Sequence, residues 1–278
     1  MPRASTPWRV GHRPIPRSRA ALGGERYASA SVKPLYVLAV VLPLIVLYEI
    51  GSGMYLARAG GQVETIRAHS LLLSFFRDFG VVGRAVPSCV IVATLLSWHV
   101  MSGARWRIKP AVLGGMVLEA AAWTVPLLVL IALVLMLGRA SAPAAIGPAW
   151  GTMPTAAGGV DLAAFPWQAR ATISIGAGLY EEFLFRLVGL TLCHAILLDL
   201  LRLPNSWATP MSIVAAGIAF ALYHDVAAGG GHVRWAELVA LGVAGVFFGV
   251  VFVYRGFGIV AMVHALYDIW VLIGLDRG

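Results

Sequence analysis

Charged residues and cysteines are both scarce in this chain of 278 residues. Charged residues make up 12% of the sequence and apolar residues 59%, whereas soluble proteins carry about 25% charged residues. The two cysteines, Cys89 and Cys193, both lie in apolar stretches, so the chain offers no disulfide framework and no thiolate metal site of ordinary spacing. The HExxH, Walker A, dinucleotide-binding and GxSxG motifs are also absent. This composition indicates a membrane protein without the common motifs of soluble enzymes.

Apolar runs long enough to cross a bilayer, about 20 residues each, follow one another from residue 34 onward. We predict seven spans, or eight, the seven being at residues 34–56, 82–101, 111–137, 169–201, 211–227, 236–254 and 257–275. The fourth run is too long for one straight span, so we expect either a long tilted helix or a helix that breaks near Arg186. The predicted fold is an all-α, multi-pass transmembrane helix bundle, and residues 34–278 form the integral membrane domain.

The basic residues gather at the ends of the predicted spans rather than on one binding face, so the net charge of +8 does not predict nucleic-acid binding. Residues 1–33 are rich in Arg, Pro, Ser and Gly, which predicts a basic, disordered tail. Because Lys and Arg favour the cytoplasmic side, we expect this tail and the loop with Arg105, Arg107 and Lys109 to be cytoplasmic. The Arg-rich, Ala- and Gly-rich composition is typical of bacteria, so we expect the chain in the bacterial cytoplasmic (inner) membrane.

Three ionisable residues, Glu181, Glu182 and Arg186, interrupt the fourth apolar run. Each costs on the order of 2.5–3.5 kcal/mol at membrane depth, so they must pair or face a wet interior, and they mark a functional site. Adjacent residues on a helix point about 100° apart, so the two carboxylates cannot reach the same point. Glu182 and Arg186 have the favourable i,i+4 order of an ion pair, which leaves Glu181 to face a cavity; the reverse assignment stays open.

Histidines on two later spans provide the remaining candidates. His224 ends the segment that begins at Phe220, and His264 precedes Asp268 by one helical turn, so these two side chains share a helix face. A histidine in a membrane span is as often a hydrogen-bonding contact between helices as it is a functional residue. We expect Phe220 to pack rather than react. The conjunction of a carboxylate pair, a histidine and a histidine–aspartate pair on three spans nevertheless predicts one functional site.

In order and spacing these motifs resemble the CPBP group of intramembrane proteases, which includes the type II CAAX prenyl endopeptidases and the bacterial Abi-like proteins. The family pattern is EExxxR, then FxxxH, then HxxxN or a related last residue. This chain has EExxxR from Glu181, FxxxH from Phe220 and HxxxD from His264, within a stretch of about residues 169–275. The resemblance implies a helical bundle that encloses a polar catalytic chamber.

The resemblance also implies that the chain is an endopeptidase that hydrolyses a peptide bond. By position, Glu181 would activate a water molecule, while His224 and His264 would orient the water or stabilise the oxyanion. Asp268 would take the place of the last polar residue. The supporting residues would be Glu182, Arg186 and Phe220.

Asp268 departs from the asparagine that is common in the prenyl endopeptidases, because an ionised aspartate cannot donate a hydrogen bond. Together with Glu181, His224 and His264 it forms a nitrogen and oxygen set able to bind zinc. We favour a reaction without metal or other cofactor, because HExxH is absent and two imidazoles suffice to polarise a carbonyl. Zinc is the alternative.

We expect the substrate to be a membrane-anchored or exported protein or peptide, cleaved near its anchor or its carboxy terminus. Peptide precursors and carboxy-terminal sorting segments are the examples we consider, because prenylation is not expected in bacteria. Two other classes stay open: a non-catalytic immunity or scaffold protein of the same fold, and a proton-coupled transporter that uses Glu181 and the histidines as a relay.

Overall fold

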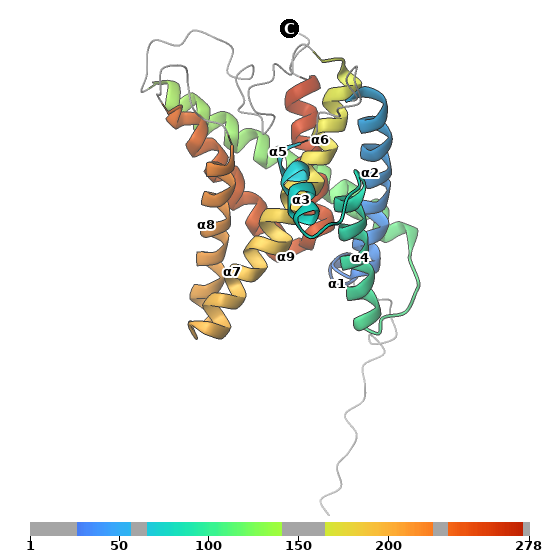
Figure 1. Ribbon diagram of the computed structural model, residues 1–278. Helices are drawn as coiled ribbons and strands as arrows, with labels where there is room; N and C mark the ends of the chain where they lie inside the picture. Colours follow the sequence, from blue (N-terminus) through green and yellow to red (C-terminus); the bar gives the residue numbers. More distant parts are fainter. Residues whose placement is uncertain (1–26, 57–65, 141–164, 225–232, 275–278) are drawn as a thin grey trace, which may run out of the picture.

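The computed structural model describes residues 27–56, 66–140, 165–224 and 233–274. Nearly all of these residues are helical, and no β-strand occurs within these ranges (Figure 1). The predicted all-α fold is therefore confirmed.

Five helical segments within the described ranges are long and apolar enough to cross a membrane. They are Pro34–Tyr55 (α2), Pro110–Gly138 in α5 (Pro110–Ala140), Trp167–Leu200, Asn205–Tyr223 (α8) and Trp235–Gly274. A shorter apolar helix, α4 (Val86–Met101), corresponds to the second predicted span. The chain is thus an integral membrane protein with several spans.

The two last predicted spans are joined in one element, α9 (Trp235–Ile269), which continues into η5 (Trp270–Gly274). Gly256 interrupts α9 with φ 77° and ψ 178°, a conformation open almost only to glycine. The helix changes direction there, and its two parts meet at an angle in Figure 1. When the two parts of α9 are counted separately and α4 is included, the five long segments become seven spans. This count agrees with the seven predicted spans.

The fourth predicted span is one continuous helical run. α6 (Trp167–Glu182) passes into the π-helical segment η3 (Phe183–Leu190), and then into α7 (Thr191–Ala195) and η4 (Ile196–Leu200). The alternative of a helix broken near Arg186 is therefore wrong. The wider turns begin directly after Glu182, and such π-segments are frequent at functional sites.

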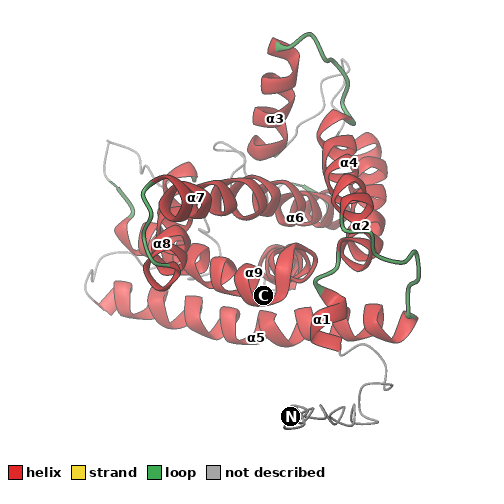
Figure 2. Ribbon diagram, turned by 90° about the horizontal axis from the view of Figure 1, so that it is seen from below, coloured by secondary structure: helices red, strands yellow, loops and turns green. Residues whose placement is uncertain are grey.

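The second part of α9 lies near the centre of the bundle. Viewed from below, α5 runs along one side of it and the run from α6 to α7 along the other (Figure 2). α8 lies at one end of this arrangement, and α2 and α4 lie at the other (Figure 2). Side chains from α6, α8 and α9 can therefore meet inside the bundle.

Apolar side chains cover the outside of the bundle, as expected for a surface in contact with lipid. The large exposed ones on α2 and α5 are Leu42, Val46, Leu47, Ile50, Met54, Leu118, Val125, Val129, Leu133 and Met136. The charged side chains of Glu181, Glu182 and Arg186 are buried instead. This distribution is the reverse of that in a soluble protein and fits the predicted polar interior.

A short helix, α1 (Tyr27–Ser31), forms where we expected the end of a disordered tail over residues 1–33. The Tyr27 hydroxyl donates to Glu119 Oε2 at 2.6 Å, and Arg255 Nη2 donates to the same oxygen at 2.7 Å. Burial, together with the hydrogen bond to Glu119, raises the pKa of Tyr27 to about 12, so the phenol keeps the proton that it donates. These contacts pair a carboxylate that lies at membrane depth, and they fix α1 against α5 and α9. Residues 1–26 of the predicted tail lie outside the described residues.

One helix, α3 (Arg67–Asp78), was not among the predicted elements. It is shorter than a span and carries polar residues along one side, so it gives no signal of membrane crossing. Figure 2 shows it standing outside α6, with the loop to α4 leaving its outer end.

We expect Gly256→Ala to destabilise the protein by about 1–3 kcal/mol, because alanine is strained at this φ and ψ. Gly114→Ala in α5 is the matched control, because an added Cβ would meet no atom within 4 Å and alanine favours the helix. Thermal unfolding of the detergent-solubilised variants, followed by tryptophan fluorescence, measures the difference. Equal melting temperatures for the two variants would contradict the role of Gly256 as the kink.

Candidate functional site

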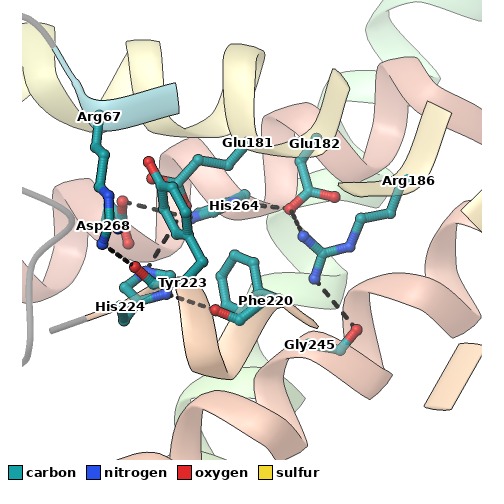
Figure 3. Close-up of polar contacts among 10 residues, drawn as sticks. All are labelled: Arg67, Glu181, Glu182, Arg186, Phe220, Tyr223, His224, Gly245, His264 and Asp268. Atoms are coloured by element: carbon teal, nitrogen blue, oxygen red, sulfur yellow. Dashed lines mark hydrogen bonds and ion pairs between the residues drawn. The ribbon is translucent and has the colours of Figure 1, made fainter. Parts of the chain in front are cut away.

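All the candidate residues from the three motifs come together inside the bundle (Figure 3). The end of α6 provides the two glutamates, and η3 provides the arginine. The phenylalanine lies near the end of α8, and one histidine directly follows this helix. The other histidine and the aspartate come from the second part of α9. These residues are Glu181, Glu182, Arg186, Phe220, His224, His264 and Asp268. The sequence thus predicted the members of this cluster, while the catalytic roles assigned to them stay predictions.

Glu182 connects the arginine to a histidine on another helix. Its Oε1 atom lies 2.9 Å from Arg186 Nη1 and accepts a hydrogen bond of 2.7 Å from His264 Nδ1. Neither the Glu182 nor the Arg186 side chain is exposed to solvent. The predicted i,i+4 ion pair is therefore present. Glu182 also holds α9 in place through its hydrogen bond with His264.

Close packing of α6 on α9 allows this contact. A Cβ atom added at Gly178, one turn before Glu182, would lie 2.5 Å from the Ala261 carbonyl oxygen and 2.8 Å from the Ala265 nitrogen. The backbones approach this closely only because glycine has no side chain. His264, between those two α9 residues, is thereby brought within hydrogen-bond distance of Glu182.

Arg186 completes its contacts with a backbone carbonyl and two aromatic rings. Its Nη2 atom donates to the Gly245 carbonyl oxygen at 3.2 Å. Its guanidinium carbon lies 4.4 Å from the ring centroid of Phe220 and 5.1 Å from that of Phe248. Cation–π contacts of this kind strengthen when water is excluded, so Arg186 is held as a buried cation.

Glu181 faces both imidazoles. Its Oε2 atom lies 3.8 Å from His224 Nε2 and 4.0 Å from His264 Nε2. These distances are too long for direct hydrogen bonds. The side chain is only 1% exposed, and neither carboxylate oxygen has a hydrogen-bond partner in the described part of the chain. A buried carboxylate without partners is exceptional and indicates a reactive position.

Hydrogen bonds at Nδ1 aim the two imidazoles at Glu181. His224 Nδ1 donates to the Phe220 carbonyl oxygen at 2.8 Å, just as His264 Nδ1 donates to Glu182. With Nδ1 engaged in these bonds, Nε2 of each ring is left for a second partner. Both Nε2 atoms therefore point toward the same carboxylate with a fixed ring orientation.

Asp268 lies at the edge of the cluster. Its Oδ2 atom is 3.6 Å from His264 Nε2, and its side chain is 23% exposed against 5% for His264. The predicted shared helix face of these two residues is confirmed. Asp268 is the most accessible of the three candidate carboxylates.

The alternative of a zinc site can be tested against this donor set. In the described part of the chain, no three side chains of His, Cys, Asp or Glu are arranged so that they could hold a metal ion. The four donors do not form a metal site as they lie here, and zinc stays the alternative to a reaction without metal.

The sequence did not predict three of the contacts at the site. The bond from Arg186 to the Gly245 carbonyl and the bond from Glu182 to His264 both join segments far apart in the sequence. Arg67, on α3, also reaches the site by bonding the carbonyl of Tyr223, the residue before His224. A single sequence carries no signal for such contacts between helices.

Comparison with known proteins gives one match, to a family model. The family model described as type II CAAX prenyl endopeptidase Rce1-like matches residues 163–270, which include all three motifs. No curated protein and no solved structure matches the chain. The match confirms the resemblance drawn from the motifs and, at the level of the family, the prediction of a membrane protease. Residues 163–270 of this membrane protein thus match the type II CAAX prenyl endopeptidase Rce1-like family.

Proposed function

We propose that the protein is an intramembrane endopeptidase in which Glu181 activates the attacking water. The observation that carries this proposal is the buried Glu181 carboxylate, which faces two imidazole Nε2 atoms at 3.8 and 4.0 Å and has no partner in the described ranges. A carboxylate held in this way is suited to act as a general base inside a membrane protein.

The first step is proton transfer from water to Glu181. The 3.8 Å between Glu181 Oε2 and His224 Nε2 leaves room for a water molecule within an ordinary hydrogen-bond distance of both, about 2.8 Å. Such a water donates one proton to each acceptor, which directs an oxygen lone pair away from both. As Glu181 takes its proton, that oxygen attacks the carbonyl carbon of the scissile peptide bond.

The second requirement is stabilisation of the oxyanion that forms on the carbonyl oxygen. We assign this role to His264, acting as an imidazolium that donates Nδ1–H to Glu182 and Nε2–H to the oxyanion. Glu181 then returns its proton to the leaving nitrogen, and the C–N bond breaks. The products are a carboxylic acid and an amine, and the enzyme regains its starting protonation.

Glu182, Arg186 and Phe220 support this chemistry without touching substrate. Arg186 neutralises Glu182, so Glu182 can orient His264 without leaving an uncompensated charge in the core. Phe220 packs between the guanidinium and the two imidazoles, at 5.9 Å from the His264 ring and 4.6 Å from the His224 ring. Asp268 Oδ2 lies 3.6 Å from His264 Nε2, beyond a direct hydrogen bond, so we assign Asp268 an electrostatic role beside the His264 ring before substrate arrives.

We propose that the substrate is a membrane-anchored or exported protein, cut near its anchor or carboxy terminus. The support is the site's burial within apolar spans, which selects substrates that share the bilayer. We further propose a bacterial cytoplasmic membrane location with the amino terminus in the cytoplasm, as the Lys and Arg bias predicts.

Glu181→Ala is expected to abolish cleavage and leave the fold intact, because Glu181 makes no hydrogen bond in the described part of the chain. Loss of a general base typically costs about 10²–10⁴-fold in rate. Mass spectrometry of membrane and exported proteins, from cells carrying wild type, Glu181→Ala or His264→Ala, should reveal a precursor that keeps its tail only with the variants.

Glu182→Ala is the matched control for this experiment. It leaves Arg186 unpaired in the core, so we expect about 3–5 kcal/mol of destabilisation and little protein in the membrane. If Glu181→Ala accumulates normally and changes no termini, the catalytic assignment fails. A scaffold or a transporter is then the better hypothesis.

We also propose that the reaction needs no metal or other cofactor. Treatment of the purified protein with 1,10-phenanthroline should therefore leave cleavage of the accumulated precursor unchanged. Loss of cleavage that added Zn²⁺ restores would instead favour the zinc alternative, with Glu181, His224, His264 and Asp268 as ligands.

A further inference from the structure

The amino-terminal half of the chain reaches the candidate site through α3, which lies outside the family-matched residues 163–270. α3 begins at Arg67, and this end of the helix faces the bundle (Figures 2 and 3). Two of its first three residues, Arg67 and His69, contact different parts of the bundle. The helix therefore connects the α2 and α6 side of the protein to the end of α8.

His69 fixes α3 on the α2 and α6 side. Its side chain is fully buried, its Nε2 atom donates to the Arg84 carbonyl oxygen at 3.1 Å, and its ring lies 5.5 Å from Tyr48 and 4.7 Å from Tyr180. Burial lowers the pKa of His69 to about 4, so the ring stays neutral and the contact is insensitive to pH near neutrality. Tyr180 directly precedes Glu181, so α3 is anchored beside the proposed general base.

Arg67 extends from this anchor to the end of α8. Its Nη1 atom donates to the Tyr223 carbonyl oxygen at 2.5 Å, and its guanidinium carbon lies 4.9 Å from the centroid of the Tyr223 ring. Tyr223 is the last residue of α8, where carbonyl groups have no partner within the helix. Arg67 provides the missing donor and stacks on the same residue.

His224 comes immediately after this point and has already left the helix. Its φ of −80° and ψ of 148° are extended, and its backbone N–H donates a long hydrogen bond of 3.3 Å to the Ala221 carbonyl oxygen. Three contacts hold this residue: the bond from Nδ1 to the Phe220 carbonyl, the bond from its N–H to the Ala221 carbonyl, and the bond of Arg67 to the carbonyl of the peptide that leads into His224. Without Arg67, the carbonyl of that peptide loses its donor, and of these two backbone contacts the peptide keeps only the longer one, the 3.3 Å bond to Ala221.

We propose that Arg67 is a positioning residue that fixes the end of α8 so that His224 Nε2 faces Glu181. Its importance for catalysis rests on the proposed function, whereas its hold on His224 does not. The amino-terminal half of the chain then contributes to the site itself, in addition to anchoring the matched domain.

The matched control for a test is Arg77→Ala. Arg77 belongs to the same helix and carries the same charge, and it is exposed in the last turn of α3, away from the site. Arg67→Ala removes the donor, and Arg67→Met removes it while keeping an apolar stem to pack. Arg67→Lys keeps one charged donor but lacks the planar fork that stacks on Tyr223.

The decisive measurement needs no substrate. Nitrogen NMR of ¹⁵N-histidine-labelled protein in detergent reports the proton position on each of the seven histidines, and His224 is assigned by its loss in His224→Gln. Wild type and Arg77→Ala should show one His224 species, protonated at Nδ1. Arg67→Ala should shift or split that signal, with Arg67→Lys in between. If Arg67→Ala does not accumulate in the membrane, Arg67→Met is measured in its place.

Cleavage provides the second measurement, with Glu181→Ala in parallel. A misplacement of about 1 Å can cost about 10²-fold in rate, so Arg67→Ala should lower kcat roughly 10- to 100-fold with little change in KM. An unchanged His224 signal in the Arg67 variants overturns the proposal. If instead Glu181→Ala cleaves like wild type, the proposed function has failed, and the NMR result still decides whether Arg67 positions His224.

Discussion

The organisation of the site depends on the neutralisation of one buried carboxylate. Glu182 lies where neither water nor lipid headgroups reach it, so its charge is tolerable only with partners. Arg186 on the next helical turn supplies the charge, and His264 from α9 supplies a second donor. Because both nitrogen atoms meet at one Glu182 oxygen, α6 and α9 are fixed in rotation as well as in distance. That fixed rotation leaves the neighbouring Glu181 directed toward the imidazoles.

Much of this could be predicted from the sequence, because the relevant signals are local. The ion pair between Glu182 and Arg186 follows from helical spacing, and so does the separation of Glu181 from it. Charged residues within apolar runs must be accommodated inside, which brought the three motifs together in the prediction. The spans follow from length and hydropathy, including the two parts of α9 that Gly256 separates.

The parts that could not be predicted depend on contacts between distant segments. α3 is amphipathic and short, so neither hydropathy nor length sets it apart from a loop. The bond from Glu182 to His264 depends on how closely α6 approaches α9, and periodicity says nothing about that distance. α1 lies in a stretch whose composition indicates disorder, and it is ordered by the partners that Tyr27 finds in the bundle. In each case tertiary packing decides the outcome.

The close approach of α8 and α9 has a consequence for how the site can vary. A Cβ atom at Gly245 would lie 2.8 Å from the Gly217 Cα atom, so neither position has room for a larger residue. The Gly245 carbonyl that this approach exposes is a partner of Arg186. The dipole of the uncharged Gly245 carbonyl thus helps to stabilise the buried Arg186 cation, and it adds no ionisable group to the core. The space at these two glycines therefore controls the surroundings of the Arg186 charge. A single methyl group at either glycine would alter those surroundings without changing any charged residue.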